Sequence, residues 1–147
     1  MKYLIVACLL ALSFVGSLKA APDDQLVAVY NTQLRPENET TPSTSQAWGH
    51  AQVKVYASGL IEWKVKINNP TGETFTAGHI HRAPAGSPGP VVQPFLGGAA
   101  TTDTHIDLRA SATNPALAAA LLANPANYYV NFHTTANGPG AIRGQLP

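Results

Sequence analysis

The sequence predicts an all-β protein, an antiparallel Greek-key-type β-sandwich of about seven or eight strands with one short helix. Two observations lead to this prediction. Short segments in which apolar and polar residues alternate recur along the chain, which is the pattern of half-buried strands. Clusters of Gly, Pro and Asn separate these segments at intervals of about eight to twelve residues, which is typical of the turns of a sandwich.

The first residues have the pattern of a secretory signal peptide. Lys2 gives a positive start, and an almost unbroken apolar run follows and ends in small residues at Ala20. We therefore expect residues 1–20 to be removed and residues 21–147 to form one domain, with its core at about 26–146. An N-terminal membrane anchor is the alternative, although the run is short for a membrane span and nothing downstream is long enough to replace it.

Cleavage changes the composition of the chain. It removes Cys8, the only cysteine, so the mature protein has no thiol and its stability must come from a packed core, turns and a bound metal. Removal of Lys2 and Lys19 leaves seven basic and eight acidic residues, a net charge of about −1. We therefore expect neither a nucleic-acid partner nor an anionic membrane surface.

The first half of the mature chain predicts three strands. Leu26–Leu34 alternates apolar and polar residues, and a polar loop over 35–47 follows it. The clearest hairpin joins Trp48–Tyr56 to Leu60–Ile67, whose odd positions are apolar and whose even positions are charged. Gly59 supplies the turn, because glycine tolerates positive φ.

The second half predicts five more extended segments and the helix. Asn114 is a suitable N-cap and Pro115 suits the first helical position, so we expect a helix at about 114–123 that covers one end of the core. Pro94 favours an edge position for the strand that contains it. The expected strands are Thr74–His81, Val91–Leu96, Thr102–Leu108, Tyr128–Thr134 and Ala141–Leu146.

Histidines occupy matching faces of two of these strands. His79 and His81 flank Ile80, and His133 follows Phe132. Because successive side chains of a strand point to opposite faces, apolar residues that face the core place all three histidines on the outer side. If the two strands are neighbours, the three imidazoles converge on one patch of the sheet.

Three neutral imidazoles suit copper, zinc, nickel or iron. The sequence associates no thiolate and no carboxylate with His79, His81 and His133, so copper is the expected ion and zinc the second choice. The alternative is that these histidines are solvated or hydrogen-bonded and hold no metal.

Three further residues are candidates for the same site. Arg143 lies near His133 if Gly138–Gly140 closes a hairpin, where it attracts anions or orients the site; the alternative is an exposed or structurally paired arginine. His50 and His105 are interpreted as surface or loop residues, and each remains a candidate for a further ligand.

Other chemical motifs are few. The chain has no Gly-x-Ser-x-Gly nucleophile motif, no phosphate-binding glycine loop and no Cys-x-x-Cys zinc pattern. Asn38-Glu39-Thr40 is an N-glycosylation acceptor sequence, which predicts a glycan on Asn38 in a eukaryotic secretory pathway.

Two blocks of the sequence resemble the CHRD (chordin) domain family: GHIHRAPAGSPGPVV at 78–92 and YYVNFHTTANGPGAIRGQL at 128–146. The usual form of the family is a His-Ile-His segment that leads through a Gly-rich turn to Gly-Pro-Val-Val. A later block reads Tyr-Val-Asn-x-His-Thr and ends in Gly-x-Ile-Arg-Gly-Gln-Leu. Ala141 stands where the family usually has Glu, so no role of that acid is carried over. The resemblance implies a single-domain secreted protein that lacks the cysteine-rich modules of chordin.

The His-x-His strand within a sandwich is also similar to Cu/Zn superoxide dismutase. In that family the paired histidines and a later strand histidine hold copper, which implies His79, His81 and His133 as copper ligands. The loop after His81 has no histidine for a zinc ligand, and the mature chain cannot form the disulfide of that family.

These features together favour a secreted CHRD-domain protein that acts as an extracellular binding or structural module and carries a surface histidine site for copper. The alternative function is that of a copper-dependent, superoxide dismutase-like redox enzyme. The expected partner is an extracellular protein or matrix component.

Overall fold

The computed structural model describes residues 21, 23–96 and 100–147. The predicted signal peptide at residues 1–20, with Cys8, lies outside the described residues and stays a prediction. Within the described ranges, no helix is both long enough and apolar enough to cross a membrane.

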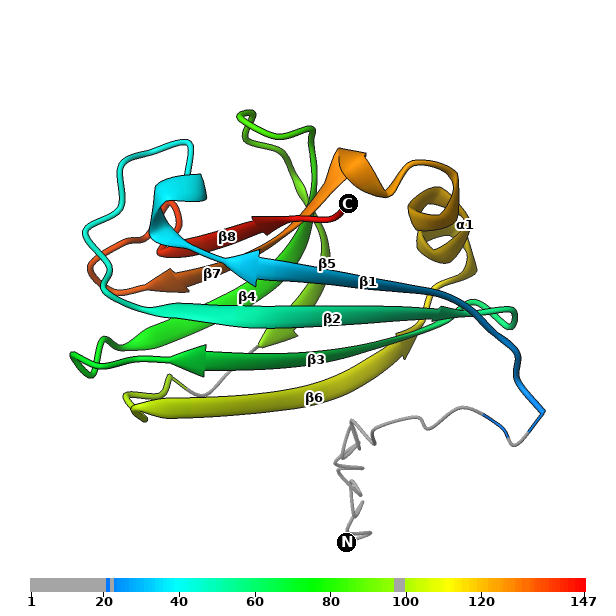
Figure 1. Cartoon of the computed structure of the whole chain (residues 1–147), viewed down its shortest axis with the longest axis horizontal. Coiled ribbons are helices and arrows are strands. Elements are labelled where there is room, and N and C mark those ends of the chain that lie inside the picture. Colours follow the sequence, from blue (N-terminus) through cyan, green and yellow to red (C-terminus); the bar gives the residue numbers. More distant parts are fainter. Residues whose placement is uncertain (1–20, 22, 97–99) are drawn as a thin grey trace, which may run out of the picture.

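Within the part of the chain that the structure describes, eight strands form two four-stranded antiparallel sheets that pack face to face (Figure 1). Sheet A has the order β1-β2-β3-β6, and sheet B has the order β5-β4-β7-β8. The strand bounds are β1 Leu26–Leu34, β2 Trp48–Tyr56, β3 Leu60–Asn68, β4 Phe75–Arg82, β5 Val91–Leu96, β6 His105–Thr113, β7 Tyr128–Thr134 and β8 Ile142–Gln145. The chain leaves sheet A after β3 and returns to lie beside it as β6, so the all-β Greek-key sandwich is confirmed.

The core lies between the inner faces of the two sheets. In β3 the odd-numbered apolar residues are buried and the even-numbered charged residues are more exposed, as the alternation predicts. Sheet B contributes Ile80, Val130, Phe132 and Ile142, each fully buried. The polar residues between these core positions therefore lie on the outer face of sheet B.

The sixth strand differs from the sequence-based prediction. Thr102–Leu108 was the expected range, whereas β6 runs from His105 to Thr113 and pairs with the whole of β3, with Thr113 opposite Leu60. The residues after Leu108 are mostly small, so they carry little hydrophobic alternation, and the ladder with β3 extends the strand past them. The expected edge position of β5 is confirmed.

Helix α1, Pro115–Ala123, closes one end of the sandwich (Figure 1). The Asn114 side chain accepts a hydrogen bond of 3.1 Å from the Leu117 amide, which is the predicted N-cap. Leu117 and Leu121 are buried in the core cluster, so the helix covers that end of the core as expected. Gly59, with φ of 84°, lies so close to Pro115 that a Cβ atom would clash with it.

Two segments cover the outer face of sheet B. The first is the 35–47 segment, which begins with the 3-10 turn Pro36–Asn38. Its start is tied to β8 by an antiparallel bridge between Arg35 and Arg143. The second is the loop 83–90 between β4 and β5. These two segments shield polar side chains of β4, β7 and β8 that would otherwise face solvent.

Glu73 holds the far end of the first covering segment in place. One of its carboxylate oxygens accepts hydrogen bonds from the Ser45 hydroxyl at 2.7 Å and from the Gln46 amide at 3.0 Å. The other accepts a bond of 3.3 Å from the Asn137 side chain. A single carboxylate therefore links the 35–47 segment to the turn that precedes β8.

Candidate metal centre

The three histidines singled out from the sequence lie together on the outer face of sheet B. His79 and His81 belong to β4 and His133 to β7, and these two strands are hydrogen-bonded neighbours. In the ladder His133 is opposite Ala77 and Asn131 is opposite His79. The convergence therefore follows from the antiparallel pairing of β4 with β7.

Gly78, between Ala77 and His79 on β4, leaves room for a core side chain beneath the histidine-bearing strand. It lies opposite Phe132, whose ring occupies the space that a side chain at position 78 would need. A Cβ atom built on Gly78 would lie 2.3 Å from that ring. The missing side chain lets Phe132 pack under the strand that carries the paired histidines.

One nitrogen from each of the three rings lies within 4.8 Å of the others, and no acidic residue joins the cluster among the described residues. The closest pair is His79 Nδ1 and His133 Nε2, at 3.2 Å. Ligand atoms about 2 Å from a tetrahedral ion lie roughly 3.3 Å from one another. The first pair already has that separation, and a side-chain adjustment of at most about 1.5 Å brings the third nitrogen to the same separation.

Backbone carbonyls fix the tautomers of two rings. His81 Nδ1 lies 2.9 Å from the carbonyl oxygen of Gly89, and His133 Nδ1 lies 2.9 Å from that of Gly138. A carbonyl oxygen only accepts hydrogen bonds, so each Nδ1 carries the proton and each Nε2 carries the lone pair; that of His133 accepts from His79 Nδ1. Orientation of a ligand imidazole by a carbonyl acceptor is the usual outer-shell arrangement at metal sites.

His81 has the most buried environment of the three histidines. The residue is 8% exposed, and its Nε2 is buried without a hydrogen-bond partner among the described residues. A buried, unpartnered nitrogen costs free energy unless something binds to it. A metal ion shared with His79 and His133 would satisfy it.

Burial also favours the uncharged form of two of the rings, His79 and His81. It lowers the pKa of His79 to about 4, with smaller contributions from the neighbouring His133 and His81. Burial likewise lowers the pKa of His81, although the bond to the Gly89 carbonyl opposes this effect. Since only neutral imidazole binds a metal, these rings are ready for one at neutral pH.

Tyr129 and Arg143 form the wall behind His81. The ring of Tyr129 is stacked on that of His81, with centroids 4.8 Å apart, and its hydroxyl accepts a bond of 3.1 Å from the Gly89 amide. The guanidinium of Arg143 lies over the same ring at 3.4 Å from its centroid. Because β4 and β8 flank β7, Tyr129 is held between the histidine and the arginine.

Arg143 is 2% exposed, and its nitrogens donate to the carbonyl oxygens of Ser87 and Pro84 at 3.0 and 3.2 Å. Of the sequence-based alternatives, this placement favours a structurally paired arginine over an exposed one, and a site-orienting role stays a prediction. An anion-attracting role stays a prediction.

Glu39 is a feature of this face that sequence reasoning missed. Its carboxylate accepts a bond of 2.6 Å from the Asn131 side chain, and burial raises its pKa to about 7 against the lowering effects of Asn131 and Arg143. Asn131 is 2% exposed, and its Oδ1 has no hydrogen-bond partner among the described residues. No local sequence signal marks Glu39, because its contacts are with strands far away along the chain.

Asn38 and Glu39 also line a pocket of about 650 Å³, together with Arg143. Asn38 itself is exposed, and its Nδ2 donates a bond of 3.0 Å to the Arg143 carbonyl. A glycosylated side-chain nitrogen keeps one proton and still donates, so this bond is compatible with the predicted glycan.

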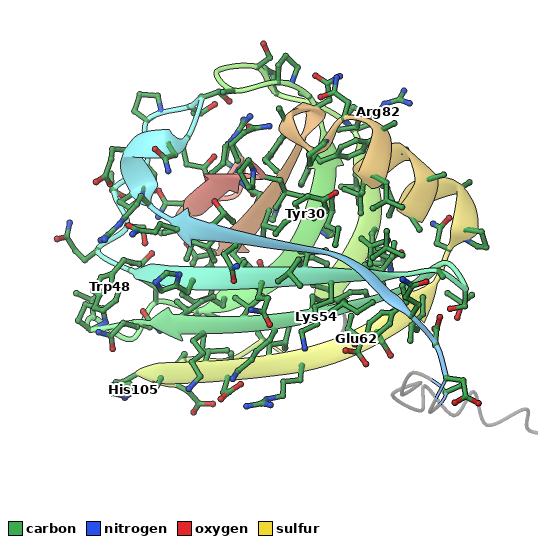
Figure 2. The ribbon with its side chains drawn as sticks, turned by 45° about the vertical axis from the view of Figure 1, so that its right-hand side comes forward. Tyr30, Trp48, Lys54, Glu62, Arg82 and His105 are labelled. Carbon is green, nitrogen blue, oxygen red and sulfur yellow. The ribbon has the colours of Figure 1, made fainter. Side chains whose placement is uncertain are left out.

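The other two histidine candidates lie elsewhere. His50 and His105 are exposed residues of β2 and β6 in sheet A, and neither joins the three-histidine cluster. Figure 2 shows His105 at the end of β6. The structure therefore brings three of the five histidines of the chain together and leaves these two on the other sheet.

The comparisons with known proteins agree with the sequence blocks that surround the site. The family model described as CHRD domain matches residues 30–146, which includes all three clustered histidines and nearly the whole described chain. No curated protein and no solved structure matches the chain. CHRD domains are typically extracellular modules. Because the family model matches most of the chain, the chain belongs to the CHRD domain family.

Proposed function

We propose that this protein is a secreted CHRD module that binds one copper ion through His79 Nδ1, His81 Nε2 and His133 Nε2, with zinc as the second choice. The observation that carries the proposal is that His81 Nε2 is buried and has no hydrogen-bond partner among the described residues, in a cluster whose three rings each offer a nitrogen within 4.8 Å of the others. Copper(II) heads the affinity order of the divalent first-row metals for nitrogen sites.

The direct test is copper binding by residues 21–147, measured by metal analysis after gel filtration and by competition with a chelator of known affinity. We expect one copper per chain, and loss of that copper in the His79→Ala/His133→Ala double variant. His50→Ala is the matched control, because it removes an exposed histidine from the other sheet. No retained metal at micromolar copper, or retention in the double variant, would contradict the site.

A dismutase-like redox activity is the second candidate. Three protein ligands leave a coordination position open, which is the arrangement of catalytic metal sites, and His79 and His133 are only partly buried. In dismutation one superoxide is oxidised to dioxygen, and a second is reduced with two protons to hydrogen peroxide. Fold analogy alone does not establish this chemistry.

The activity test compares the copper-loaded protein with the double variant and with free copper at the same concentration. Superoxide loss that depends on His79 and His133 and exceeds that of free copper supports the enzyme. Copper binding without such turnover would leave a metal-binding module and contradict the redox reading.

Secretion and glycosylation belong to the same proposal. Expression of the full chain in eukaryotic cells is expected to release a protein into the medium whose first residue is Ala21. A mass decrease on treatment with an N-glycosidase, absent in Asn38→Gln, would locate the glycan. Retention of residues 1–20 in the cell-associated protein would instead favour the membrane anchor.

A further inference from the structure

The outer face of sheet A carries more than half of the basic residues that follow the predicted signal peptide. Of the seven basic residues from position 21 on, four lie on the strands β2, β3 and β6 and point away from the core. We call this surface the cationic face; its basic residues are Lys54, Lys64, Lys66 and Arg109. Two carboxylates share it, Glu62 opposite Lys54 and Asp107 opposite Lys66. It lies on the opposite side of the sandwich from the three histidines.

The charges of the cationic face are only partly compensated. Lys64 lies directly opposite Arg109 in the β3–β6 ladder, and like charges in that relation repel each other. Asp107 is the one carboxylate between Lys66 and Arg109, at 3.6 and 3.4 Å. Among the described residues Lys64 has no ion-pair partner. An external anion would therefore be attracted most strongly to the centre of this face.

Amide side chains and a small hollow adjoin these cations. A pocket of about 220 Å³ is lined by Lys64 and Lys66 and by the polar residues Asn31, His50 and Gln52. Drug-sized ligands occupy pockets of roughly 300 Å³ or more. The hollow is therefore suited to a single sulfate or carboxylate group of a longer chain, with amides beside it that bind hydroxyl groups.

The composition of the face argues against other polyanions. Single-stranded nucleic acid needs large aromatic side chains for base stacking, and the residues that line the pocket with Lys64 include no Trp, Tyr or Phe. Tyr56 donates its hydroxyl to Glu62, and Trp48, at the far end of β2, lies under the guanidinium of Arg35. Figure 2 shows Lys54 and Glu62 on the same side of the molecule, and Trp48 towards its other end.

We propose that the cationic face binds a sulfated polysaccharide, with sulfate groups on Lys64, Lys66 and Arg109 and sugar hydroxyls on Asn31 and Gln52. The interaction is independent of the histidine site, because it uses the other sheet. It depends on salt, because each sulfate that binds a lysine or arginine releases counterions.

The test uses heparin as the probe and measures affinity as a function of sodium chloride concentration. We expect binding that weakens with salt with a logarithmic slope of about −2 to −3, as for two or three ion contacts. The Lys64→Gln/Arg109→Gln double variant should lose at least about tenfold in affinity. Both side chains point to solvent, so folding, checked by circular dichroism, should be unchanged.

The matched control is Lys64→Gln alone against Arg82→Gln, which removes the same charge from an exposed position of sheet B (Figure 2). Arg82→Gln should keep heparin affinity within about twofold, whereas Lys64→Gln should not. Equal losses in the two single variants would show a net-charge effect and overturn the site. Equal binding of desulfated heparin, of single-stranded DNA or of anionic vesicles would overturn the assignment to a sulfated polysaccharide.

Discussion

The imidazole of His81 and the phenol ring of Tyr129 lie parallel, with centroids 4.8 Å apart and planes inclined by 9°. Gly89 bonds to both residues, through its carbonyl oxygen to His81 and through its amide to Tyr129. The most buried histidine of the cluster is therefore held by a strand neighbour and by one residue of the loop 83–90.

Arg143→Lys should weaken the metal site although it keeps the charge. An ammonium group cannot lie flat on Tyr129 while it also bonds to the carbonyls of Pro84 and Ser87, so the loop that holds His81 loosens. We expect copper affinity to fall by about tenfold, in the range found for outer-shell residues. We also expect the free energy of unfolding to fall by about 2 kcal/mol. Competition titration measures the copper affinity, and urea denaturation measures the free energy of unfolding. Arg82→Lys is the exposed control. Unchanged copper affinity in Arg143→Lys would show that the loop does not position His81.

Gly89→Ala and Gly138→Ala should differ, although the carbonyls of both glycines bond to site histidines. A Cβ atom on Gly89 would lie 2.1 Å from the Arg82 carbonyl oxygen, whereas one on Gly138 meets nothing within 4 Å. We therefore expect Gly89→Ala to lower the free energy of unfolding by about 2 kcal/mol or more and to weaken copper binding. Gly138→Ala should change stability by less than about 0.5 kcal/mol. Urea denaturation and copper titration of both variants check the difference, and similar losses in the two would contradict this account of the loop.

Glu39→Gln should stabilise the protein at neutral pH. The folded-state pKa of Glu39 is raised from 4.5 to about 7, so the fold binds this proton more tightly than the unfolded chain does. The carboxyl therefore destabilises the fold progressively as pH rises from 4.5 to about 7. Glutamine keeps an acceptor for Asn131 and has no carboxyl group to ionise. The substitution should therefore raise the free energy of unfolding at pH 8 by about 1 kcal/mol after allowance for solvent screening. Urea denaturation at pH 4 and pH 8 checks the sign: the gain should appear only at the higher pH.

The metal-free protein should lose stability in mild acid through His79. Its pKa falls from 6.5 to about 4 on folding, so below pH 6.5 the unfolded chain binds more protons than the folded one. The contribution of His79 is therefore complete above pH 6.5 and declines as pH falls towards 4. His79→Gln should reduce the loss between pH 7 and pH 4.5, measured as urea midpoints, whereas the exposed His50→Gln should not. An identical loss in wild type and His79→Gln would show that His79 ionises freely in the fold.

Much of the fold was predictable because it rests on local patterns. A few consecutive residues are enough to show the apolar–polar alternation of β2 and β3 and the N-cap at Asn114. The error at β6 arose where that signal ends, since the small residues after Leu108 are extended by pairing with β3 and not by their own preference.

The candidate site was predictable in part. The sequence named the three histidines and placed them on outer faces by parity, but the carboxylate of Glu39 was missed. Glu39 meets Asn131 across a separation of 92 residues, and no short-range pattern records such a contact.

The sequence alone was enough to predict most of the strands, the side of each strand on which the histidines lie, and the family blocks around them, because side-chain alternation is a local property of an extended chain. The distance of 3.2 Å between His79 Nδ1 and His133 Nε2, from residues 54 positions apart, depends on the tertiary fold. The packing of the loop 83–90 and Tyr129 around His81 buries its Nε2, which has no hydrogen-bond partner in the part of the chain that the structure describes. The physical reason is that both features depend on contacts between distant parts of the chain. The register between β4 and β7 brings the rings together. Hydrogen bonds to carbonyl oxygens of two separate loops determine which nitrogen of His81 and of His133 carries the proton.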